Sequence, residues 1–317
     1  MTDLELLTTG RVGVDLYPEQ TGPIAAVETF AKSVGGTATN VAVAAARLGR
    51  RAAVLTKVGD DPLGAFVTQA LAERFGVETR FVGVAPGLPT PVVFAELDPP
   101  ERPRIIFYRY PKAPDMTLTL DDVDLETAAS VPILWVAGDR FSDEPSRSTA
   151  LAMLEARGRR RHTVLDLDYR PSFWASPEEA GDWIGRALDQ VTIAVGNRIE
   201  CEVAVGTTDP DEAANRLLAR GVEIAIVKLG EEGVLVAAAE GTRGLIPPVP
   251  VEVVCGLGAG DAFGGALCHG LLEGWDLVRA ARFANAAGAV VASRLLCADA
   301  MPTLAEVAEV EARAAAS

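Results

Sequence analysis

A glycine-rich turn near the carboxyl end of the chain carries a single acidic residue. Gly256, Gly258 and Gly260 precede Asp261, and an apolar, helix-like run follows. Because glycine adopts positive φ and lets the backbone approach a ligand, successive N–H groups at a helix start can surround an anion. An aspartate at such an anion hole is explained if it accepts the proton of a hydroxyl that attacks phosphorus. Gly258-Ala259-Gly260-Asp261 therefore predicts phosphoryl transfer, with Asp261 as the catalytic base beside the anion hole.

Two commoner phosphate-binding motifs do not fit this turn. A dinucleotide fingerprint G-x-G-x-x-G beginning at Gly256 would need a glycine where Asp261 stands. A Walker loop would need Lys followed by Ser or Thr after its last glycine, but Asp261 follows Gly260 directly. For an isolated turn, tight packing at a helix entry would be the favoured interpretation. The phosphoryl-transfer hypothesis therefore depends on the rest of the chain.

A second glycine-rich stretch, Gly35-Gly36-Thr37-Ala38-Thr39-Asn40, lies near the amino end. Thr37 or Thr39 can cap a following helix, and the two glycines let a ligand approach the backbone. Asn40 would face that ligand from the first turn, although it could equally be a capping residue. Asp15, which stands among apolar neighbours, is either a turn carboxylate or the acceptor of a substrate hydroxyl.

Polar side chains also follow three consecutive strand-like runs in the second half of the chain. They are Asp166, Asp168 and Arg170 after the first run, Asn197 and Glu200 after the second, and Lys228 and Gly230 after the third. Ligands of open parallel sheets bind beyond the carboxyl ends of the strands. We therefore expect these side chains to lie around one site.

Alternating strand and helix patterns supply the elements that would position these residues. The alternation predicts an α/β fold with a mainly parallel sheet covered by helices on both faces. The expected strands are 4–10, 11–17, 52–58, 133–137, 163–168, 192–195, 223–229, 233–238 and 251–254. The expected helices are 37–49, 63–75, 145–157, 177–190, 209–219, 260–273, 276–295 and 303–315.

Residues 86–115 differ in composition from the rest of the chain, because prolines interrupt the strand-like runs 91–97 and 104–110. Proline on strands indicates edges and hairpins rather than a buried parallel sheet. We therefore predict a small β lid formed by residues 11–35 and 86–115. The large α/β domain would comprise residues 1–10, 36–85 and 116–317. An exposed lid edge would allow a homodimer formed lid to lid.

Charge and cysteine content restrict the classes of partner. The 317 residues carry a formal net charge of −15, which disfavours nucleic acids and anionic membrane surfaces. The start of the chain lacks a signal-peptide pattern, so we expect a cytoplasmic protein. The four cysteines have no C-x-x-C spacing and only two histidines accompany them, so we expect buried thiols rather than a zinc site.

The two glycine-rich stretches resemble the two signatures of the PfkB family of ribokinase-like carbohydrate kinases, and the match extends over essentially the whole chain. The resemblance implies a three-layer sandwich with a β lid, ATP and Mg²⁺ as cofactors, and Asp261 as the base. It implies that Asn197-x-x-Glu200 positions magnesium through water, with Glu200 nearest the metal. It also implies that the turn from Lys228 through Gly230 to Gly233 lines the nucleotide phosphates and that Asn285 borders the adenine.

The resemblance departs from the family pattern just before Gly258. Cys255-Gly256-Leu257 stands where the family usually has Asp-Thr-Thr. Whether a monovalent cation such as K⁺ binds there is therefore left open.

Within the family, the segments 10–18, 107–115 and 166–174 resemble kinases that phosphorylate the sugar acid 5-dehydro-2-deoxygluconate in inositol catabolism. Kinases of 2-keto-3-deoxygluconate share the tyrosine-arginine lid and the D-x-[ND]-x-R element, so they are the alternative. The resemblance implies that Tyr108, Asp168, Asp15, Asn40, Gly35 and Gly36 contact the sugar. A guanidinium matches a carboxylate bidentately, so Arg109 and Arg170 are the candidates for the acid group. Other sugar or nucleoside kinases and a non-catalytic binding protein are further alternatives.

Overall fold

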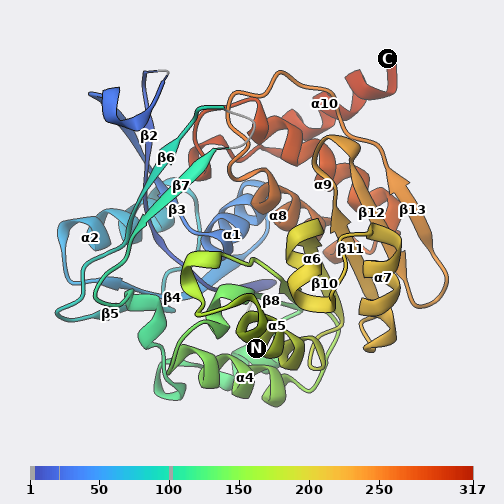
Figure 1. The fold of residues 1–317 in the computed structure, drawn as a ribbon, viewed down its shortest axis with the longest axis horizontal. Helices are drawn as coiled ribbons and strands as arrows, with labels where there is room; N and C mark the ends of the chain where they lie inside the picture. Colours follow the sequence, from blue (N-terminus) through green and yellow to red (C-terminus); the bar gives the residue numbers. More distant parts are fainter. Residues whose placement is uncertain (1–3, 21, 100–102, 317) are drawn as a thin grey trace.

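The computed structural model describes residues 4–20, 22–99 and 103–316, which form one large and one small β-sheet (Figure 1). The large sheet has the order β13-β12-β11-β10-β9-β8-β1-β4-β5. Its neighbouring strands from β5 to β11 pair in parallel, whereas β12 pairs antiparallel with both β11 and β13. The strands are β1 Leu6–Thr9, β4 Ala52–Gly59, β5 Val82–Ala85, β8 Ile133–Ala137, β9 Thr163–Asp166, β10 Ile193–Asn197, β11 Ile224–Lys228, β12 Val234–Ala238 and β13 Arg243–Ile246.

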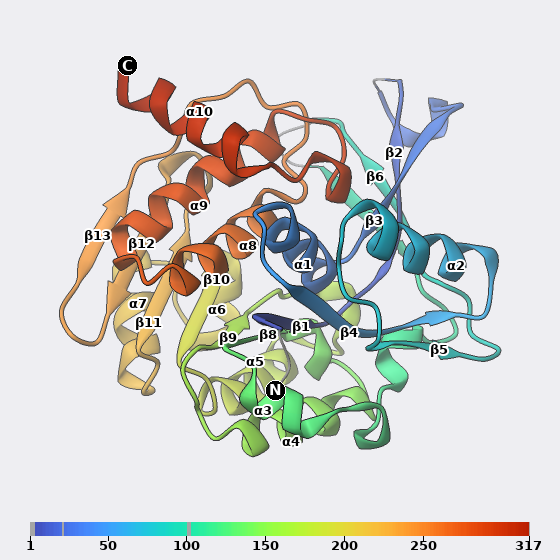
Figure 2. The same cartoon turned by 180° about the vertical axis from the view of Figure 1, so that it is seen from behind.

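Both faces of the large sheet are buried, because successive strand side chains point to opposite sides. On β8, Ile133 and Trp135 pack into one core, while Leu134 and Val136 pack into the other. The first core contains α1 Thr37–Arg47, α2 Pro62–Gln69, α8 Ala259–Leu272, α9 Leu277–Ala292 and α10 Leu304–Ala316. The second contains α3 Leu125–Ser130, α4 Ser146–Arg157, α5 Pro177–Leu188, α6 Arg198–Val205 and α7 Pro210–Ala219. In Figure 2, α1, α8 and α9 lie above strands β1 and β8, and α3, α4 and α5 lie below them.

The small sheet has the order β3-β2-β6-β7 and stands at one side of the large one. Its strands are β2 Gly13–Pro18, β3 Phe30–Gly35, β6 Val92–Glu96 and β7 Arg104–Tyr108. All four fall within the two segments predicted to form the lid, so the predicted architecture of a parallel sheet with a small β lid is confirmed. The domain boundaries themselves remain a prediction. The two segments are joined by a parallel pairing of β2 with β6, not by a hairpin.

Short helical turns complete the fold. The π-helical turn Ala70–Arg74 continues α2, so the helix predicted at 63–75 has two parts. The 3-10 turns are Ile24–Ala26, Pro114–Thr117, Leu120–Asp122, Gly138–Phe141, Pro171–Phe173, Gly230–Glu232 and Ala298–Ala300. Of the helices in the described residues, none is long and apolar enough to cross a membrane.

Two local predictions were wrong. Residues 251–254 are not a strand: they have no strand partner, and the Val254 and Cys255 amides donate to the Ala292 carbonyl on α9. Neither Thr37 nor Thr39 caps α1, because its N-cap is Gly36, with φ 108° and no side-chain cap. Thr39 Oγ1 instead donates to the Arg11 carbonyl, and Thr37 Oγ1 accepts from the Arg11 guanidinium. Both threonines therefore fix the start of the lid segment.

Candidate active site

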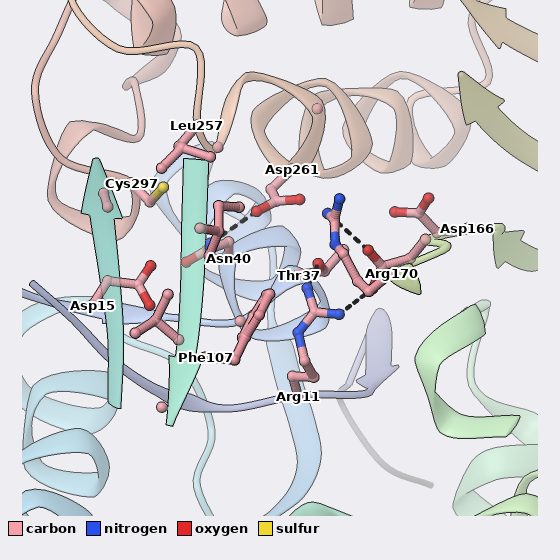
Figure 3. A pocket seen from close by; sticks show the side chains of 18 of the residues that line it. Arg11, Asp15, Thr37, Asn40, Phe107, Asp166, Arg170, Leu257, Asp261 and Cys297 are labelled. Carbon is pink, nitrogen blue, oxygen red and sulfur yellow. Dashed lines mark hydrogen bonds and ion pairs between the residues drawn. The ribbon is translucent and has the colours of Figure 1, made fainter. Parts of the chain in front are cut away.

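A cavity of about 390 Å³ lies between the small sheet and the carboxyl ends of β9, β10 and β11 (Figure 3). Most of the predicted site residues line it: Asp15, Gly36, Asn40, Arg109, Asp168, Arg170, Asn197, Glu200, Lys228, Gly230, Gly258, Gly260 and Asp261. They come from segments far apart in the sequence, since both Asp15 and Asp261 line the cavity. The expectation that strand-end polar residues converge is therefore confirmed.

Asp261 stands in the first turn of α8 and points into this cavity (Figure 3). The helix begins at Gly258, whose φ of 81° favours glycine and where a Cβ would lie 2.7 Å from Cys297 Sγ. Asn40 Nδ2 donates to Asp261 Oδ2 over 2.8 Å. The amide thus fixes the carboxylate while the amino end of α8 presents unpaired N–H groups beside it.

The electrostatic surroundings of Asp261 suit a base. Burial raises the pKa of Asp261 to about 6, and the nearby Asp168 carboxylate adds to the rise. The Asn40 hydrogen bond and the cations Lys228 and Arg170 act in the opposite direction on that pKa. A carboxyl with a pKa near 6 is deprotonated at neutral pH, yet it is more basic than an ordinary aspartate.

Lys228 lies near two carboxylates, Asp166 at the end of β9 and Glu200 in the first turn of α6. Its Nζ is 3.8 Å from Asp166 Oδ1 and 4.0 Å from Glu200 Oε2. Burial alone would lower the pKa of Lys228, but Asp166 and Glu200 raise it above its ordinary value. Lys228 therefore stays charged and can bind phosphate oxygens as a point charge.

Glu200 and Asn197 have a structural role besides any catalytic one. Asn197 Oδ1 accepts from the amides of Ile199 and Glu200, and Glu200 Oε2 accepts from the Asn197 amide over 2.7 Å. This reciprocal pair is a capping box at the start of α6. Both residues still line the cavity.

The surroundings of Lys228 also fit a hydrated magnesium ion. Burial raises the pKa of Asp166 to about 7, and its Oδ1 has no hydrogen-bond partner among the described residues. Magnesium keeps several waters in proteins, and carboxylate oxygens accept hydrogen bonds from them. Asp166 and Glu200 are the residues that would hold such a water shell.

Arginines surround Asp168, another carboxylate that lines the cavity. Arg11 Nη1 donates to Asp168 Oδ2 over 2.6 Å, and Arg170 Nη2 lies 2.9 Å from Asp168 Oδ1. Burial opposes ionisation of Asp168, but Arg11 and Arg170 hold its pKa below the ordinary value. Arg109 Nη2 pairs with the buried Asp115 over 3.1 Å. Asp168 is therefore an anchor for two guanidinium groups.

Two donors of this arginine cluster are left over. Arg109 Nη1 and Arg170 Nε are buried and make no hydrogen bond within the described part of the chain. Both arginines line the cavity that contains Asp261. A buried N–H without a partner is costly, so these two donors suit an anionic group of a ligand.

Asp15 approaches the cavity from β2, because the neighbouring strand leaves room for it. A Cβ on Gly35 would lie 2.1 Å from the Asp15 carboxyl group. The Tyr17 hydroxyl lies 3.3 Å from Asp15 Oδ2 and 2.6 Å from Cys297 Sγ. Burial raises the pKa of Asp15 to about 7, so a substrate hydroxyl would be a favourable partner.

A second groove, of about 920 Å³, adjoins the cavity and shares Lys228, Gly230, Gly256 and Gly260 with it. Ala259, Gly233 and Asn285 line this groove together with apolar side chains such as Val249 and Val253. Asn285 Nδ2 donates to the Pro247 carbonyl over 2.6 Å, which ties α9 to the groove wall. Gly233 has φ 95°, and a Cβ there would lie 2.0 Å from the Ile246 carbonyl oxygen. Four of the predicted nucleotide residues, Lys228, Gly230, Gly233 and Asn285, thus line this groove, whereas Asn197 lines the cavity.

Two predicted substrate residues, Gly35 and Tyr108, lie outside the residues that line the cavity. Tyr108 is 61% exposed and lies outside the residues that line the cavity. Because strand side chains alternate, Ile105, Phe107 and Arg109 face the cavity while Tyr108 faces away and packs against Phe94. The predicted sugar contact of Tyr108 is therefore not supported.

Arg11, Tyr17 and Cys297 line the cavity without having been predicted as site residues. Arg11 directly follows the first strand, so the strand-end rule applied to Asp166 and Lys228 would have found it. The thiol of Cys297 carries no comparable signal. All four cysteines are buried and free, as expected.

The segment just before the anion hole is Cys255-Gly256-Leu257. Cys255 is buried beside Tyr17 and Cys297, and Leu257 lines the cavity. The side chains at positions 255–257 supply no oxygen atom. From this segment, only main-chain carbonyls could bind a monovalent cation.

Comparisons with known proteins agree with this geometry. The family model "pfkB family carbohydrate kinase" matches residues 3–304. A protein named 5-dehydro-2-deoxygluconokinase from Photobacterium profundum is 35% identical over 307 residues, which cover 95% of this chain and 92% of that protein. Another of that name, from Clostridium tetani, is 31% identical over 312 residues, with 96% and 91% covered.

Solved structures of other proteins are similar to this chain over nearly its whole length. A putative ribokinase II from E. coli in complex with ATP and Mg²⁺ superposes with a TM-score of 0.86 at 25% identity, covering 98% of this chain and 99% of that one. A fructokinase from Vibrio cholerae O395, in a form with fructose, ADP and calcium bound, has a TM-score of 0.85 at 27% identity, with 98% and 99% covered. The chain has the ribokinase-like fold and belongs to the PfkB family of carbohydrate kinases.

Proposed function

We propose that this kinase transfers the γ-phosphoryl group of ATP to the primary hydroxyl of a sugar acid, most closely 5-dehydro-2-deoxy-D-gluconate, to give its 6-phosphate. The observation that carries the proposal is the pair of unpartnered donors, Arg109 Nη1 and Arg170 Nε, in the cavity that holds Asp261. The names of the relatives from Photobacterium profundum and Clostridium tetani support the choice of acid.

The residues of the site divide the chemistry between them. Asp261 accepts the proton of the primary hydroxyl as its oxygen forms the new bond to phosphorus. The bond between the γ-phosphorus and the bridging oxygen breaks, and ADP leaves with that electron pair. Lys228 and the N–H groups at the start of α8 stabilise negative charge on the transferring group. Bound Mg²⁺ would neutralise phosphate charge, and Asp166 and Glu200 would hold its waters.

The acid group determines the orientation of the sugar in this proposal. A carboxylate bound by Arg109 and Arg170 would hold the sugar in the cavity that also contains Asp261. In a protein with a net charge of −15, a carboxylate beside ATP needs such a local positive site. The runner-up substrate, 2-keto-3-deoxygluconate, carries the same carboxylate, so the arginines support the class more strongly than the individual acid.

Substitution of the arginines tests the proposal. Arg109→Ala or Arg170→Ala should lower kcat/KM for the acid by about 10- to 150-fold, equivalent to the 1.5–3 kcal/mol of a hydrogen bond to a charged group. Weak turnover of neutral sugars should change little. Arg147→Ala is the matched control, because Arg147 also pairs with a carboxylate and covers an aromatic ring, Trp183, outside the cavity. Equal losses for acid and neutral sugars would overturn the carboxylate assignment.

We also propose that two copies associate through their lids. The outer face of the small sheet carries an aromatic row in which Phe94 packs edge-on against Phe30 and Tyr108, and Tyr108 is 61% exposed. Exposed apolar surface of this kind favours association. Sedimentation should give a dimer that Tyr108→Lys dissociates, and a monomeric wild-type protein would contradict the proposal.

The remaining proposal concerns the cellular location and the pathway of the kinase. The charge of −15 disfavours nucleic-acid and membrane partners. We place the kinase in the cytoplasm, and we place its substrate in inositol catabolism because its segments resemble kinases of that pathway. Growth on inositol of a strain that lacks the gene would test the pathway, and normal growth would contradict it.

A further inference from the structure

We propose that Phe173, which lies outside the residues lining the cavity, is a positioning residue for recognition of the substrate carboxylate. Its ring holds the guanidinium of Arg109 and ties the base of the lid to the large domain. The inference deepens the proposed function and rests on it, because it assumes that Arg109 binds an acid.

The contacts of Phe173 join two parts of the fold. Phe173 closes the 3-10 turn Pro171–Phe173, which follows Arg170 after β9, and its amide donates to the Arg170 carbonyl over 2.9 Å. Arg109 Cζ lies 4.2 Å from the centroid of its ring. Phe107, on lid strand β7, packs edge-on against it with centroids 4.8 Å apart. One half-buried ring in the large domain therefore contacts two neighbouring residues of the lid.

A second arginine shares this ring. Arg11, which precedes lid strand β2, has its Cζ 5.5 Å from the Phe173 centroid and 5.8 Å from that of Phe107. Cations within about 6 Å of a ring centroid are attracted to the ring. Phe173 thus lies beside arginines that enter the site from both lid segments.

The pairing of Arg109 shows what the ring adds. Among the described residues, Arg109 Nη2 pairs with Asp115 Oδ2 at 3.1 Å, and Arg109 Nη1 has no hydrogen-bond partner. One ion pair leaves the guanidinium free to turn about that contact. The aromatic ring restrains its plane without using an N–H group, so Nη1 stays available to a ligand. Without the ring, part of the binding energy of the substrate would be spent on ordering the Arg109 side chain.

Two substitutions separate this role from simple packing. Phe173→Leu keeps an apolar side chain but removes the ring, whereas Phe173→Tyr keeps the ring. Phe81→Leu is the matched control, because Phe81 is also half-buried with Arg80 Cζ 4.7 Å from its centroid, and it lies outside the cavity. KM and kcat for the sugar acid, KM for ATP and the melting temperature are measured for each variant.

The expected result is specific to the acid. Phe173→Leu should raise KM for the sugar acid by about 3- to 30-fold, the range that corresponds to cation–π contacts, with kcat and the KM for ATP within about twofold. Phe173→Tyr and Phe81→Leu should each have the wild-type KM for the sugar acid. In an Arg109→Ala background, Phe173→Leu should add little, because the two residues act through one contact.

Other outcomes overturn the inference in distinguishable ways. If the wild-type enzyme phosphorylates the acid but Phe173→Leu matches it, the inference fails and the proposed function stands. Parallel rises in the KM values for acid and ATP, with a lowered melting temperature, would reduce Phe173 to a packing residue. If the wild-type enzyme does not phosphorylate a sugar acid, the proposed function fails and takes this inference with it.

Discussion

Asp261 combines a buried environment with nearby positive charge, and the balance decides its chemistry. Burial and Asp168 favour the neutral acid, whereas the Asn40 amide, Lys228 and Arg170 favour the carboxylate. The resulting pKa of about 6 leaves the group ionised at neutral pH. A fully exposed aspartate would be a weaker base, and an isolated buried one would stay protonated.

Removal of Asp261, the proposed base, should affect turnover far more than nucleotide binding. Asp261→Asn should lower kcat by about 10²- to 10⁴-fold, the usual contribution of general base catalysis. Asp209→Asn is the control, because Asp209 caps the distant helix α7 and asparagine caps equally well. Near-normal kcat in Asp261→Asn would remove Asp261 from the mechanism.

The pH profile follows from the same pKa. Only the deprotonated carboxylate accepts a proton, so kcat/KM should fall as the pH drops below about 6 and be flat just above neutrality. Because the pKa of Asp261 is raised, the fall in kcat/KM should occur at a higher pH than it would with an ordinary aspartate. A profile that stays flat down to pH 4 would contradict the assignment.

Glu200 offers a separate test of the metal environment. Glu200→Gln keeps the oxygen that accepts from the Asn197 amide, so the melting temperature should hold while the Mg²⁺ concentration for half-maximal activity rises. Glu306→Gln alters an equivalent contact, with the Thr303 amide at the start of α10, and should leave the Mg²⁺ requirement unchanged. An unaltered Mg²⁺ requirement in Glu200→Gln would restrict Glu200 to capping.

Single residues also show where prediction from sequence succeeds and fails. Asp261 and Asn40 could be predicted because glycine-rich helix starts identify them. Tyr108 was misplaced because a strand turns neighbouring side chains to opposite faces, so Arg109 and Tyr108 cannot both face the cavity. Arg11 was missed, although its position after β1 obeys the strand-end rule. The donors left free by Arg109 and Arg170 depend on pairings with Asp115 and Asp168 that no spacing reveals.

At the scale of elements, the contact between α1 and α8 brings the base and its amide together. Asn40 lies on α1 and Asp261 on α8, and the helices approach closely because Gly264 and Gly265 lack side chains. A Cβ on Gly265 would lie 2.4 Å from Ala44 Cβ and 2.7 Å from the Ala45 backbone nitrogen. Because these neighbours are a methyl group and a backbone atom, they cannot move far to make room for a side chain at Gly265.

Gly265→Ala should therefore destabilise the protein although alanine is the better helix former. We expect the free energy of unfolding to fall by about 1–3 kcal/mol, the usual cost of overpacking, and kcat to fall as Asn40 moves from Asp261. Gly185→Ala, in helix α5, is the control, since the nearest atom to its Cβ is the flexible Arg220 guanidinium at 3.2 Å. Equal denaturation midpoints for the wild type and Gly265→Ala would contradict the packing argument.

Prediction of elements was best where hydrophobic periodicity was long. Strand β8 was predicted at its observed bounds, and α4, α5 and α7 were predicted within two residues at either end. Residues 251–254 alternate like a strand, but a strand needs a hydrogen-bonded neighbour, and these residues pair with the end of α9 instead. The edge strands β5 and β13, with four residues each, were too short to show a pattern.

At the scale of the whole molecule, the two sheets divide the work of the site. The large parallel sheet presents Asp166, Asn197 and Lys228 from the ends of adjacent strands, and the small sheet brings Asp15 and Arg109 over them. The groove proposed for the nucleotide and the cavity proposed for the sugar share Lys228, Gly230, Gly256 and Gly260. Transfer between two bound substrates requires such a shared boundary, where the reacting atoms are held together.

The central claim, a kinase whose arginines select a sugar acid, is tested most directly by a substrate panel. Purified enzyme with ATP and Mg²⁺ is assayed against 5-dehydro-2-deoxygluconate, 2-keto-3-deoxygluconate, fructose, ribose and adenosine, and kcat/KM is compared. The account predicts the highest kcat/KM for 5-dehydro-2-deoxygluconate, with both acids above the three neutral compounds. The highest kcat/KM for fructose, ribose or adenosine would contradict it.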